Sequence, residues 1–520
     1  MARNYSLQAL TSFAGGLNYR TDQFNLAQNE SPDLLNVDVD PRGGIRLRRG
    51  IEVIDGAGTA LGAVKGLGSF FTDGGLSEII CNHGTVVAFS TGSSAWTPIG
   101  GQTARTSGSR MYGVTMNNVF YAVSGDITSF KVSSGNSGTD LGTNLNGTAG
   151  NFPISQYVAF WNNHMWTGKT RESSIYYNSR IRWSHLNDPE TWTQTSYADI
   201  DIGERGDEIT GLVPMSDRLL IFKSNSVHAM FGHDTETFQM VPLTRDVGSV
   251  ALSSPVSTPL GVFFWHDQAG VYLYDGTNFN YIFDKLKPAI DDGRIRFNTP
   301  PQLAWFRNRL YVSIDWTEDG LTKRRTLVYD PSLGAWTLTN IDAEPLLAHV
   351  PPGGEPFLIG ACKDNSGRVI KLEQNRYTDL YAQTPAKIVS YFTTPWVSGK
   401  NPIVQKRWGK PRLVMDTSAT GSVDYEVYND YDKATSVTKT FQVTGRGSTS
   451  VFGAATWRSN SGDVGDGTWS ASAGQSITDV IKLTTMGSAK SVAIKINGPD
   501  HLSAYEVNAM MFTYVPRRLR

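Results

Sequence analysis

Apolar and polar residues alternate along most of the chain in short runs, and each run ends at a tight polar turn. One phrase recurs with variations: an alternating strand, a turn, a second strand and an aromatic residue. Its copies begin at Met111, Tyr157, Gly211, Gly261 and Leu303. Alternation with period two predicts β-strands, and a multi-strand unit repeated every ~40–50 residues is typical of a β-propeller. The pattern therefore predicts sheets repeated around a central axis.

The repeat runs over residues 63–387 and divides most simply into seven units, with six as the alternative because the first and last units are the weakest. The units are residues 64–100, 105–141, 154–202, 209–250, 255–297, 303–341 and 346–380. A stretch at 135–150 is rich in Gly, Asn and Thr and has little to bury, which predicts a long exposed loop between units.

The regions on either side of the repeat have their own patterns. In the N-terminal arm, residues 1–62, a Ser-Pro pair at 31–32 predicts the start of a short helix. Alternation on both sides of a Pro-Arg-Gly-Gly turn within 37–48 predicts a β-hairpin. Residues 388–520 contain strands separated by long polar turns, which indicates a separate β-sandwich. The expected fold is all-β: a β-propeller of six to seven blades, an N-terminal hairpin arm and a C-terminal β-sandwich domain.

The charge balance argues against tight nucleic-acid binding as the main activity. The 520 residues include 47 Lys and Arg against 48 Asp and Glu, a net charge of −1. Proteins that bind nucleic acid through its phosphates usually have a basic excess. Transient contact with double-stranded DNA in a channel is compatible with this balance, because each Lys–phosphate contact would oppose sliding.

Cysteine use and hydropathy bear on the compartment. Cys81 and Cys362 are the two cysteines, and we expect free thiols in a reducing compartment rather than a disulfide. The N-terminal residues lack the apolar core of a signal peptide, and no run of ~18 apolar residues occurs. We therefore expect a cytosolic product without a membrane-spanning segment.

Motifs for catalysis or cofactor binding are weak. Gly168–Thr170 is similar to the end of a phosphate-binding loop, but Asn163 stands where a glycine is needed and a strand pattern follows. Residues 461–469 are similar to the aspartate box of sialidase-type propellers, which is a structural turn. Asp463 with Asp466, or Asp364 with Asn365, could bind calcium, although a solvated turn is the simpler interpretation.

Other titratable residues also lack a catalytic pattern. The eight histidines form no H-E-x-x-H motif, and no G-x-S-x-G elbow occurs. The acidic residues within 201–208 are interpreted as a solvated loop. We expect no catalytic residue, no metal, no cofactor and no enzymatic activity.

Basic residues gather in two places, and both clusters are candidate contact sites. The first consists of Arg46, Arg48 and Arg49, and the second of Arg517, Arg518 and Arg520. The first cluster is a candidate for facing DNA or a neighbouring subunit, and the second for contacting a partner. The alternative for both is solvated charge at sheet edges, which discourages aggregation.

Several phrases resemble one protein family. They are Gly15–Asn18, Ser31–Val37 and Gly44–Gly50 in the arm, Arg182–Trp192 with its Trp-Ser and Asp-Pro pairs, and the closing strand Ala504–Arg518. Together they resemble the tail nozzle, or tail hub, proteins of short-tailed bacteriophages. The resemblance touches the whole chain and is dense only in the first 50 residues.

The resemblance implies a structural role in a virion tail. It implies a homo-oligomeric ring, usually a hexamer, assembled in the host cytoplasm below the tail adaptor and portal-side proteins, with tail fibre or tail needle proteins as further partners. Such a ring retains packaged DNA and conducts it during ejection, and the family brings no catalytic residues. The rival classes are a virion-associated propeller glycosidase or depolymerase and a carbohydrate-binding receptor-recognition protein. An enzyme of this kind would need convergent carboxylates at a propeller mouth, whereas a nozzle would need large subunit interfaces.

Overall fold

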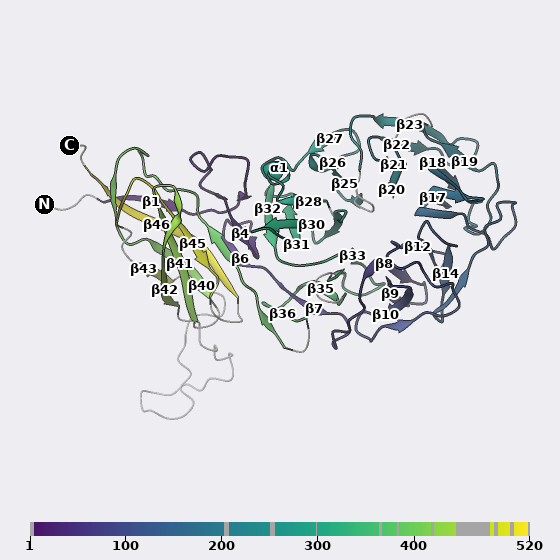
Figure 1. The fold of residues 1–520 in the computed structure, drawn as a ribbon, viewed down its shortest axis with the longest axis horizontal. Helices are drawn as coiled ribbons and strands as arrows, with labels where there is room; N and C mark the ends of the chain where they lie inside the picture. Colours follow the sequence, from purple (N-terminus) through teal and green to yellow (C-terminus); the bar gives the residue numbers. More distant parts are fainter. Residues whose placement is uncertain are drawn as a thin grey trace, which may run out of the picture.

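The structure, a computed structural model, is built almost entirely from β-strands. It describes residues 5–201, 207–249, 255–297, 299–362, 367–381, 384–417, 421–443, 479–482, 487–499 and 504–517. The helices of this described part are η1 (Asp284–Leu286) and α1 (Lys287–Asp291). Figure 1 shows a ring of sheets at one end of the molecule and a stack of long strands at the other, where both chain termini lie. The prediction of an all-β propeller protein with a further β region is confirmed.

Seven antiparallel sheets, each with four principal strands, follow one another in the described residues between the arm and the C-terminal region. The first four sheets consist of β8 (Val64–Phe71), β9 (Ser77–His83), β10 (Val86–Ser90) and β11 (Thr97–Pro98); β12 (Tyr112–Met116), β13 (Val119–Val123), β14 (Phe130–Ser133) and β15 (Ser137–Asp140); β16 (Ile154–Trp161), β17 (His164–Glu172), β18 (Ile175–Trp183) and β19 (Tyr197–Asp199); and β20 (Ile209–Pro214), β21 (Leu219–Lys223), β22 (Val227–Phe231) and β23 (Gln239–Thr244).

The remaining three sheets follow the same plan. They consist of β24 (Val256–Thr258), β25 (Gly261–His266), β26 (Gly270–Tyr274) and β27 (Phe279–Tyr281); β29 (Gln302–Phe306), β30 (Arg309–Glu318), β31 (Leu321–Asp330) and β32 (Ala335–Thr339), with β28 (Ile295–Arg296) added beside β30; and β33 (Leu346–His349), β34 (Phe357–Ala361), β35 (Val369–Gln374) and β7 (Gly50–Val53). Most strands of each described sheet fall within one of the seven sequence units, but β7 joins the last sheet from the arm, and β28, within the unit 255–297, joins the sixth sheet.

The first strands of these sheets form a closed series around an axis. Strand β8 contacts β12, and contacts continue through β16, β20, β24, β29 and β33 back to β8. A closed series of innermost strands is the arrangement of a propeller. Strand pairing between the segment that precedes the first sheet and the last sheet supports the closure, because β7 of the arm pairs with β35 as the outermost strand of the last sheet.

Two local expectations differ from the structure. Within 135–150, Ser137–Asp140 is not a free loop but β15, which pairs with β14, while most residues of 142–150 are exposed. The short helix expected after Ser31 is also wrong, because Glu30–Ser31 is β3 and Leu34–Leu35 is β4.

Tertiary pairing explains why no helix forms in the arm. Strand β4 pairs antiparallel with β38 (Tyr391–Thr393), a strand more than 350 residues away in sequence. The Ser31 hydroxyl, expected to cap a helix, donates a hydrogen bond to the carbonyl oxygen of Thr393 at 2.8 Å. Local propensity is a weak preference that such contacts override.

The rest of the arm also consists of strands. They are β1 (Ser6–Leu10), β2 (Gly16–Leu17), which pairs in parallel with β3, and β5 (Val37–Val39) and β6 (Ile45–Leu47), which form the expected hairpin. Both β1 and β6 pair with β46 in the C-terminal region, whereas β7 pairs with β35 of the propeller. The arm therefore contributes strands to both ends of the molecule.

The C-terminal region contains two facing sheets. The first consists of β43 (Asp479–Lys482), β40 (Arg412–Thr417), β46 (Tyr505–Pro516), β39 (Lys406–Trp408) and β44 (Gly487–Ala489), joined by β1, β5 and β6; the second consists of β4, β38, β45 (Val492–Asn497), β41 (Gly421–Asn429) and β42 (Asp432–Val443). A separate pair, β36 (Thr378–Asp379) and β37 (Ala386–Lys387), connects the propeller to this region. Apolar side chains from both sheets share one core, as in a β-sandwich.

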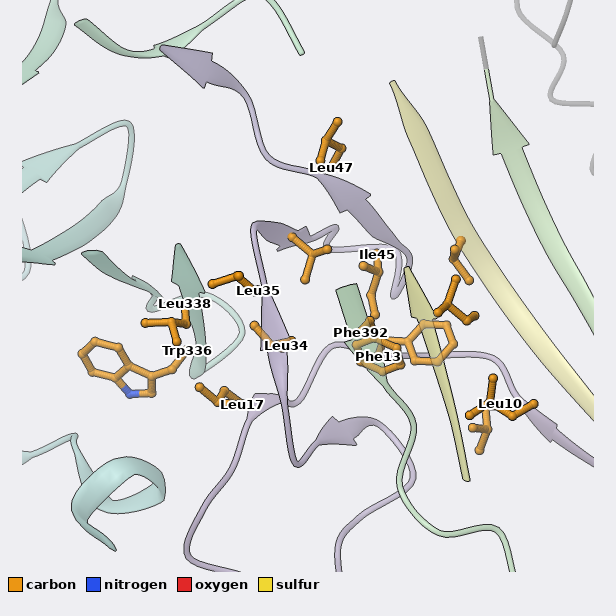
Figure 2. Packing of buried hydrophobic residues seen from close by; sticks show 14 of the residues in the cluster. Leu10, Phe13, Leu17, Leu34, Leu35, Ile45, Leu47, Trp336, Leu338 and Phe392 are labelled. Atoms are coloured by element: carbon orange, nitrogen blue, oxygen red, sulfur yellow. The ribbon is translucent and has the colours of Figure 1, made fainter. Parts of the chain in front are cut away.

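One hydrophobic core extends from the sandwich through the arm into the propeller. Figure 2 shows Leu17 and Leu34 of the arm beside Trp336 of β32. On the other side of the arm, the ring of Phe13 meets the ring of Phe392 edge-on, with centroids 5.0 Å apart. The arm therefore fills the space between the two larger parts with buried apolar side chains.

Candidate functional site

The junction of the arm, the propeller and the sandwich contains the residues that the sequence analysis singled out in the N-terminal phrases. Gly16 has φ +65°, and a Cβ atom there would lie 2.6 Å from the carbonyl oxygen of Trp336. A side chain at this position would therefore push the arm away from β32. Glycine is required both by the close approach and by the left-handed backbone.

Asn36 connects three segments at this junction. Its side-chain Oδ1 accepts hydrogen bonds from Arg48 Nε at 2.8 Å and from the backbone N–H of Asn340 at 2.9 Å. Its Nδ2 donates to the carbonyl oxygen of Val389 at 2.6 Å. Asn36 has φ +55°, a conformation that asparagine tolerates better than most residues. One amide side chain thus links the arm to the sixth propeller sheet and to the entry of the sandwich.

Arg48 is buried at the same junction, with 1% of its side chain exposed. Its guanidinium donates to both carboxylate oxygens of Asp379, at 2.8 and 2.6 Å, and to Asn36. It also donates to Asn340 Oδ1 at 3.1 Å and to the carbonyl oxygen of Arg49 at 3.0 Å. All five guanidinium N–H groups therefore have acceptors within the chain. The structure contradicts a DNA-facing or subunit-facing role for Arg48, because no donor is left for an external group.

Arg46 and Arg49 are half-buried and lie near carboxylates of the chain itself. Arg46 Nη1 lies 3.4 Å from Asp40 Oδ2. Arg49 is one of the charges near Glu373, whose pKa is raised to about 7 by burial and by the neighbouring carboxylate of Asp38, with Arg309 and Arg49 opposing the shift. The three arginines thus do not form one exposed basic patch, contrary to the interpretation of the sequence cluster.

Half-buried Glu373 and buried Asp38 form an acidic pair at the base of the arm. Asp38, on β5, is 3% exposed and lies 3.3 Å from Arg309 of β30. Arg309 also reaches Asp330 at 3.5 Å. Loss of contact with solvent raises the pKa of Glu373, and the neighbouring Asp38 carboxylate raises it further, because the two carboxylates share the nearby Arg309 cation.

The C-terminal arginine cluster is described only in part. Arg517 is exposed at the end of β46, and its backbone N–H donates to the carbonyl oxygen of Gln405 at 2.9 Å. It borders a hollow of about 750 Å³ that also contains Arg407, Lys410 and Arg412. Arg518 and Arg520 lie outside the described residues. Sequence reasoning missed the other three cations of this hollow because they lie about 100 residues before Arg517.

The acidic stretch at 201–208 is not simply a solvated loop. Asp207 is 4% exposed and its Oδ2 lies 3.2 Å from Nζ of Lys223, which is itself fully buried. The Ser226 hydroxyl donates to the same carboxylate at 2.7 Å. A buried lysine needs such a partner, and neither residue type alone signals burial in the sequence. Glu204 lies outside the described residues.

A histidine–serine arrangement joins the first and last propeller sheets. The ring nitrogens of His349 lie 2.9 Å from Ser69 Oγ and 2.8 Å from Ser77 Oγ. Burial and the nearby Lys371 charge lower the pKa of His349 to about 4. The contact is internal and bridges β33 to β8 and β9, so its evident role is to hold the propeller closed.

The remaining sequence candidates have simple outcomes. Lys169 lies in strand β17 and pairs with Glu208 at 2.7 Å, consistent with the rejection of a phosphate loop. The aspartate-box stretch 461–469 and the two calcium candidates, Asp463 with Asp466 and Asp364 with Asn365, lie outside the described residues. Within the described ranges, no group of three or more His, Cys, Asp or Glu is arranged to hold a metal ion.

Cys81 and Cys362 are both buried and are not joined in a disulfide, as predicted. No helix in the described part of the chain is long and apolar enough to cross a membrane.

Comparisons with known proteins leave the family open. No protein-family model matches the chain, and no curated protein matches it. Among solved structures, YCF48 bound to D1 peptide is 11% identical, with a TM-score of 0.39, covering 66% of this chain and 100% of that one. The AfRom2 CNH domain is 10% identical, with a TM-score of 0.37, covering 62% of this chain and 99% of that one. The RRP9 WD40 repeats are 9% identical, with a TM-score of 0.39, covering 63% of this chain and 99% of that one. At these TM-scores the propeller assignment rests on the strand pairing of this chain itself.

Proposed function

We propose that this chain is a structural subunit of the tail of a short-tailed bacteriophage, and that copies of it form the nozzle or hub ring. The observation that carries the proposal is the placement of the N-terminal phrases. The phrases that resemble this family supply Gly16, Asn36 and Arg48, and these residues join the propeller to the sandwich. The resemblance therefore falls on the residues that hold the architecture together.

The proposed assembly is a homo-oligomeric ring of six copies in the virion tail, assembled in the host cytoplasm. Heterologous contacts that close on themselves generate rings. A permanent ring of this kind needs interfaces of about 2,000 Å² or more. Its partners would be the tail adaptor and portal-side proteins on one side and tail fibre or needle proteins on the other.

The proposed ring holds the end of the packaged DNA and conducts it without tight binding. The net charge of −1 supports this idea, because release of counterions rewards each phosphate that a protein neutralises. A conduit has no use for that favourable binding free energy, since it must let the DNA slide. Since Arg48 is used inside the chain, we do not assign it to a DNA gate.

Purified particles test the proposal directly. We expect about six copies per virion, located around the tail axis by electron microscopy of the particle. One copy per particle, or a location in the capsid shell, would refute it. A monomer in isolation is compatible with the proposal if the adaptor templates the ring, so the particle is the deciding sample.

Among the described residues, one cleft has side chains that would suit the rival carbohydrate-active class. A cleft of about 490 Å³ lies between the arm and the β30–β31 hairpin, and it is lined by Tyr19, Trp316 and Tyr391 together with Asp33 and Glu318. Aromatic rings and carboxylates are the groups that a glycosidase or lectin would use. We propose that the chain is not an enzyme. Hydrolysis of host-surface polysaccharide by the purified protein, lost in Asp33→Asn and Glu318→Gln, would favour the rival instead.

A further inference from the structure

The hollow on the C-terminal sheet, here called the basic groove, is defined by Arg407, Lys410, Arg412 and Arg517 with Tyr5. It has a volume of about 750 Å³, and no carboxylate is among the described residues that line it. Four cationic side chains thus share one concave surface.

Strand register explains how these cations come together. Arg407 lies opposite Val515, and Arg412 lies opposite Met511, both on β46. Met511, Thr513 and Val515 alternate with buried Phe512 and Tyr514, so they point away from the sandwich core, and exposed Arg517 follows directly after the strand. The cations on the neighbouring strands therefore occupy the same outer face.

The four cations have no internal counter-charge among the described residues. All four are exposed, and no described carboxylate forms an ion pair with them. A second cationic hollow, of about 600 Å³, differs in this respect. There Arg180 pairs with Asp199 at 2.6 Å and Arg182 pairs with Glu172 at 2.7 Å. Of these two hollows, as far as the described residues show, the basic groove is the one left with repelling like charges, which an anionic occupant would relieve.

Apolar exposure beside the groove favours a protein occupant over nucleic acid. Tyr5 is 59% exposed and Leu7 is 63% exposed. Leu7 lies opposite Thr513, another groove residue, so both lie on the outer face of the sheet. Protein interfaces combine Arg and Tyr with apolar contacts, whereas a phosphate backbone would leave Leu7 unused.

We propose that the basic groove binds an acidic segment of a protein partner. Carboxylates of the segment would accept paired hydrogen bonds from the arginine guanidinium groups, whose geometry suits bidentate contacts. An apolar residue of the segment would pack against Leu7. The proposal goes beyond ring formation and does not depend on it, because the groove lies within one subunit.

The test uses the full-length protein and a fluorescein-labelled peptide in which Asp and Glu alternate with Leu, followed by fluorescence polarisation. The groove variant replaces Arg407, Arg412 and Arg517 by Gln. The matched control replaces Arg42, Arg296 and Lys323, three exposed cations elsewhere, by Gln. Because all six side chains are exposed, both variants should melt at the temperature of the unaltered protein.

We expect the groove variant to bind the peptide at least about tenfold more weakly, a loss of ~1.4 kcal/mol, and the control to stay within about twofold. A peptide in which Asn and Gln replace Asp and Glu should not bind. The Leu7→Ser variant of the protein should bind the acidic peptide more weakly. The proposal is overturned if the groove variant binds as well as the control, or if no saturable binding occurs up to about 1 mM peptide. It is also overturned if a duplex of about 20 base pairs binds more tightly than the peptide and loses that affinity in the groove variant, since the site would then be one for nucleic acid.

Discussion

Removing the guanidinium of Arg48 should weaken the attachment of the arm to the propeller and lower the free energy of unfolding. In Arg48→Leu, both oxygens of Asp379 lose their hydrogen-bond donors while remaining 94% buried, since 6% of that side chain is exposed. Breaking a buried ion pair by removing one partner costs about 3–5 kcal/mol. We therefore expect a loss of unfolding free energy in this range, seen as a lower urea midpoint and faster proteolysis within the arm.

Two further variants separate the causes of that loss. Arg48→Lys keeps the charge but offers three N–H donors where arginine has five, so it loses at least two hydrogen bonds at about 1 kcal/mol each. The double variant Arg48→Leu with Asp379→Leu removes both charges and should recover much of the loss. The control is Arg46→Gln, whose pair with Asp40 is 3.4 Å long and partly exposed. This change should cost under about 1 kcal/mol.

The same set of variants also distinguishes a joint from a DNA gate. If Arg48→Leu is as stable as Arg46→Gln, the account of the buried guanidinium fails. If particles carrying Arg48→Leu assemble normally, keep their thermal stability and leak DNA, then this arginine faces the channel and our placement of it is wrong.

Three other predictions concern backbone, acid and thiol chemistry. Gly16→Ala should be destabilised by about 1–3 kcal/mol more than the control Gly56→Ala. Both glycines have φ +65°, but a Cβ atom at Gly56 would meet nothing within 4 Å. Equal urea midpoints for the two variants would therefore refute the clash argument. Because the pKa of Glu373 is raised to about 7 from an ordinary value of 4.5, the folded state binds its proton more tightly than the unfolded state, and stability should fall as pH rises from about 5 to 7. Glu373→Gln should remove that slope in urea titrations, and an unchanged slope would assign it to other groups. Cys81 and Cys362 should resist a thiol reagent in the native protein and both react in denaturant; burial also raises the pKa of Cys81, and rapid native labelling would contradict their burial.

Much of the propeller could be read from the sequence because its signals are local. Strand alternation, turns and buried aromatics recur within each unit, so the units follow the strands closely. The outermost strand of the last sheet could not be assigned in this way. Strand β7 is four residues long, and its partner β35 lies more than 300 residues later.

The misread sites share one physical cause, which is long-range partnership. Ser31 and Pro32 carry a helix-start signal, yet the segment pairs with β38. Arginine is a residue type that usually lies at the surface, so the sequence does not show that Arg48 is buried. The partner that makes its burial possible, Asp379, follows 331 residues later. The sequence analysis named Arg517 as a candidate partner contact, which stays a prediction, and the other cations of the basic groove become its neighbours only through the register of β46.

The central claim is that copies of this chain form a ring in a phage tail. Electron microscopy of the intact particle, with the subunit located by a tag on an exposed loop and counted by quantitative mass spectrometry, tests it most directly. The account predicts about six copies arranged symmetrically around the tail axis, with DNA density passing through the ring. A single copy per particle, or a protein absent from the tail and active on polysaccharide, would contradict it.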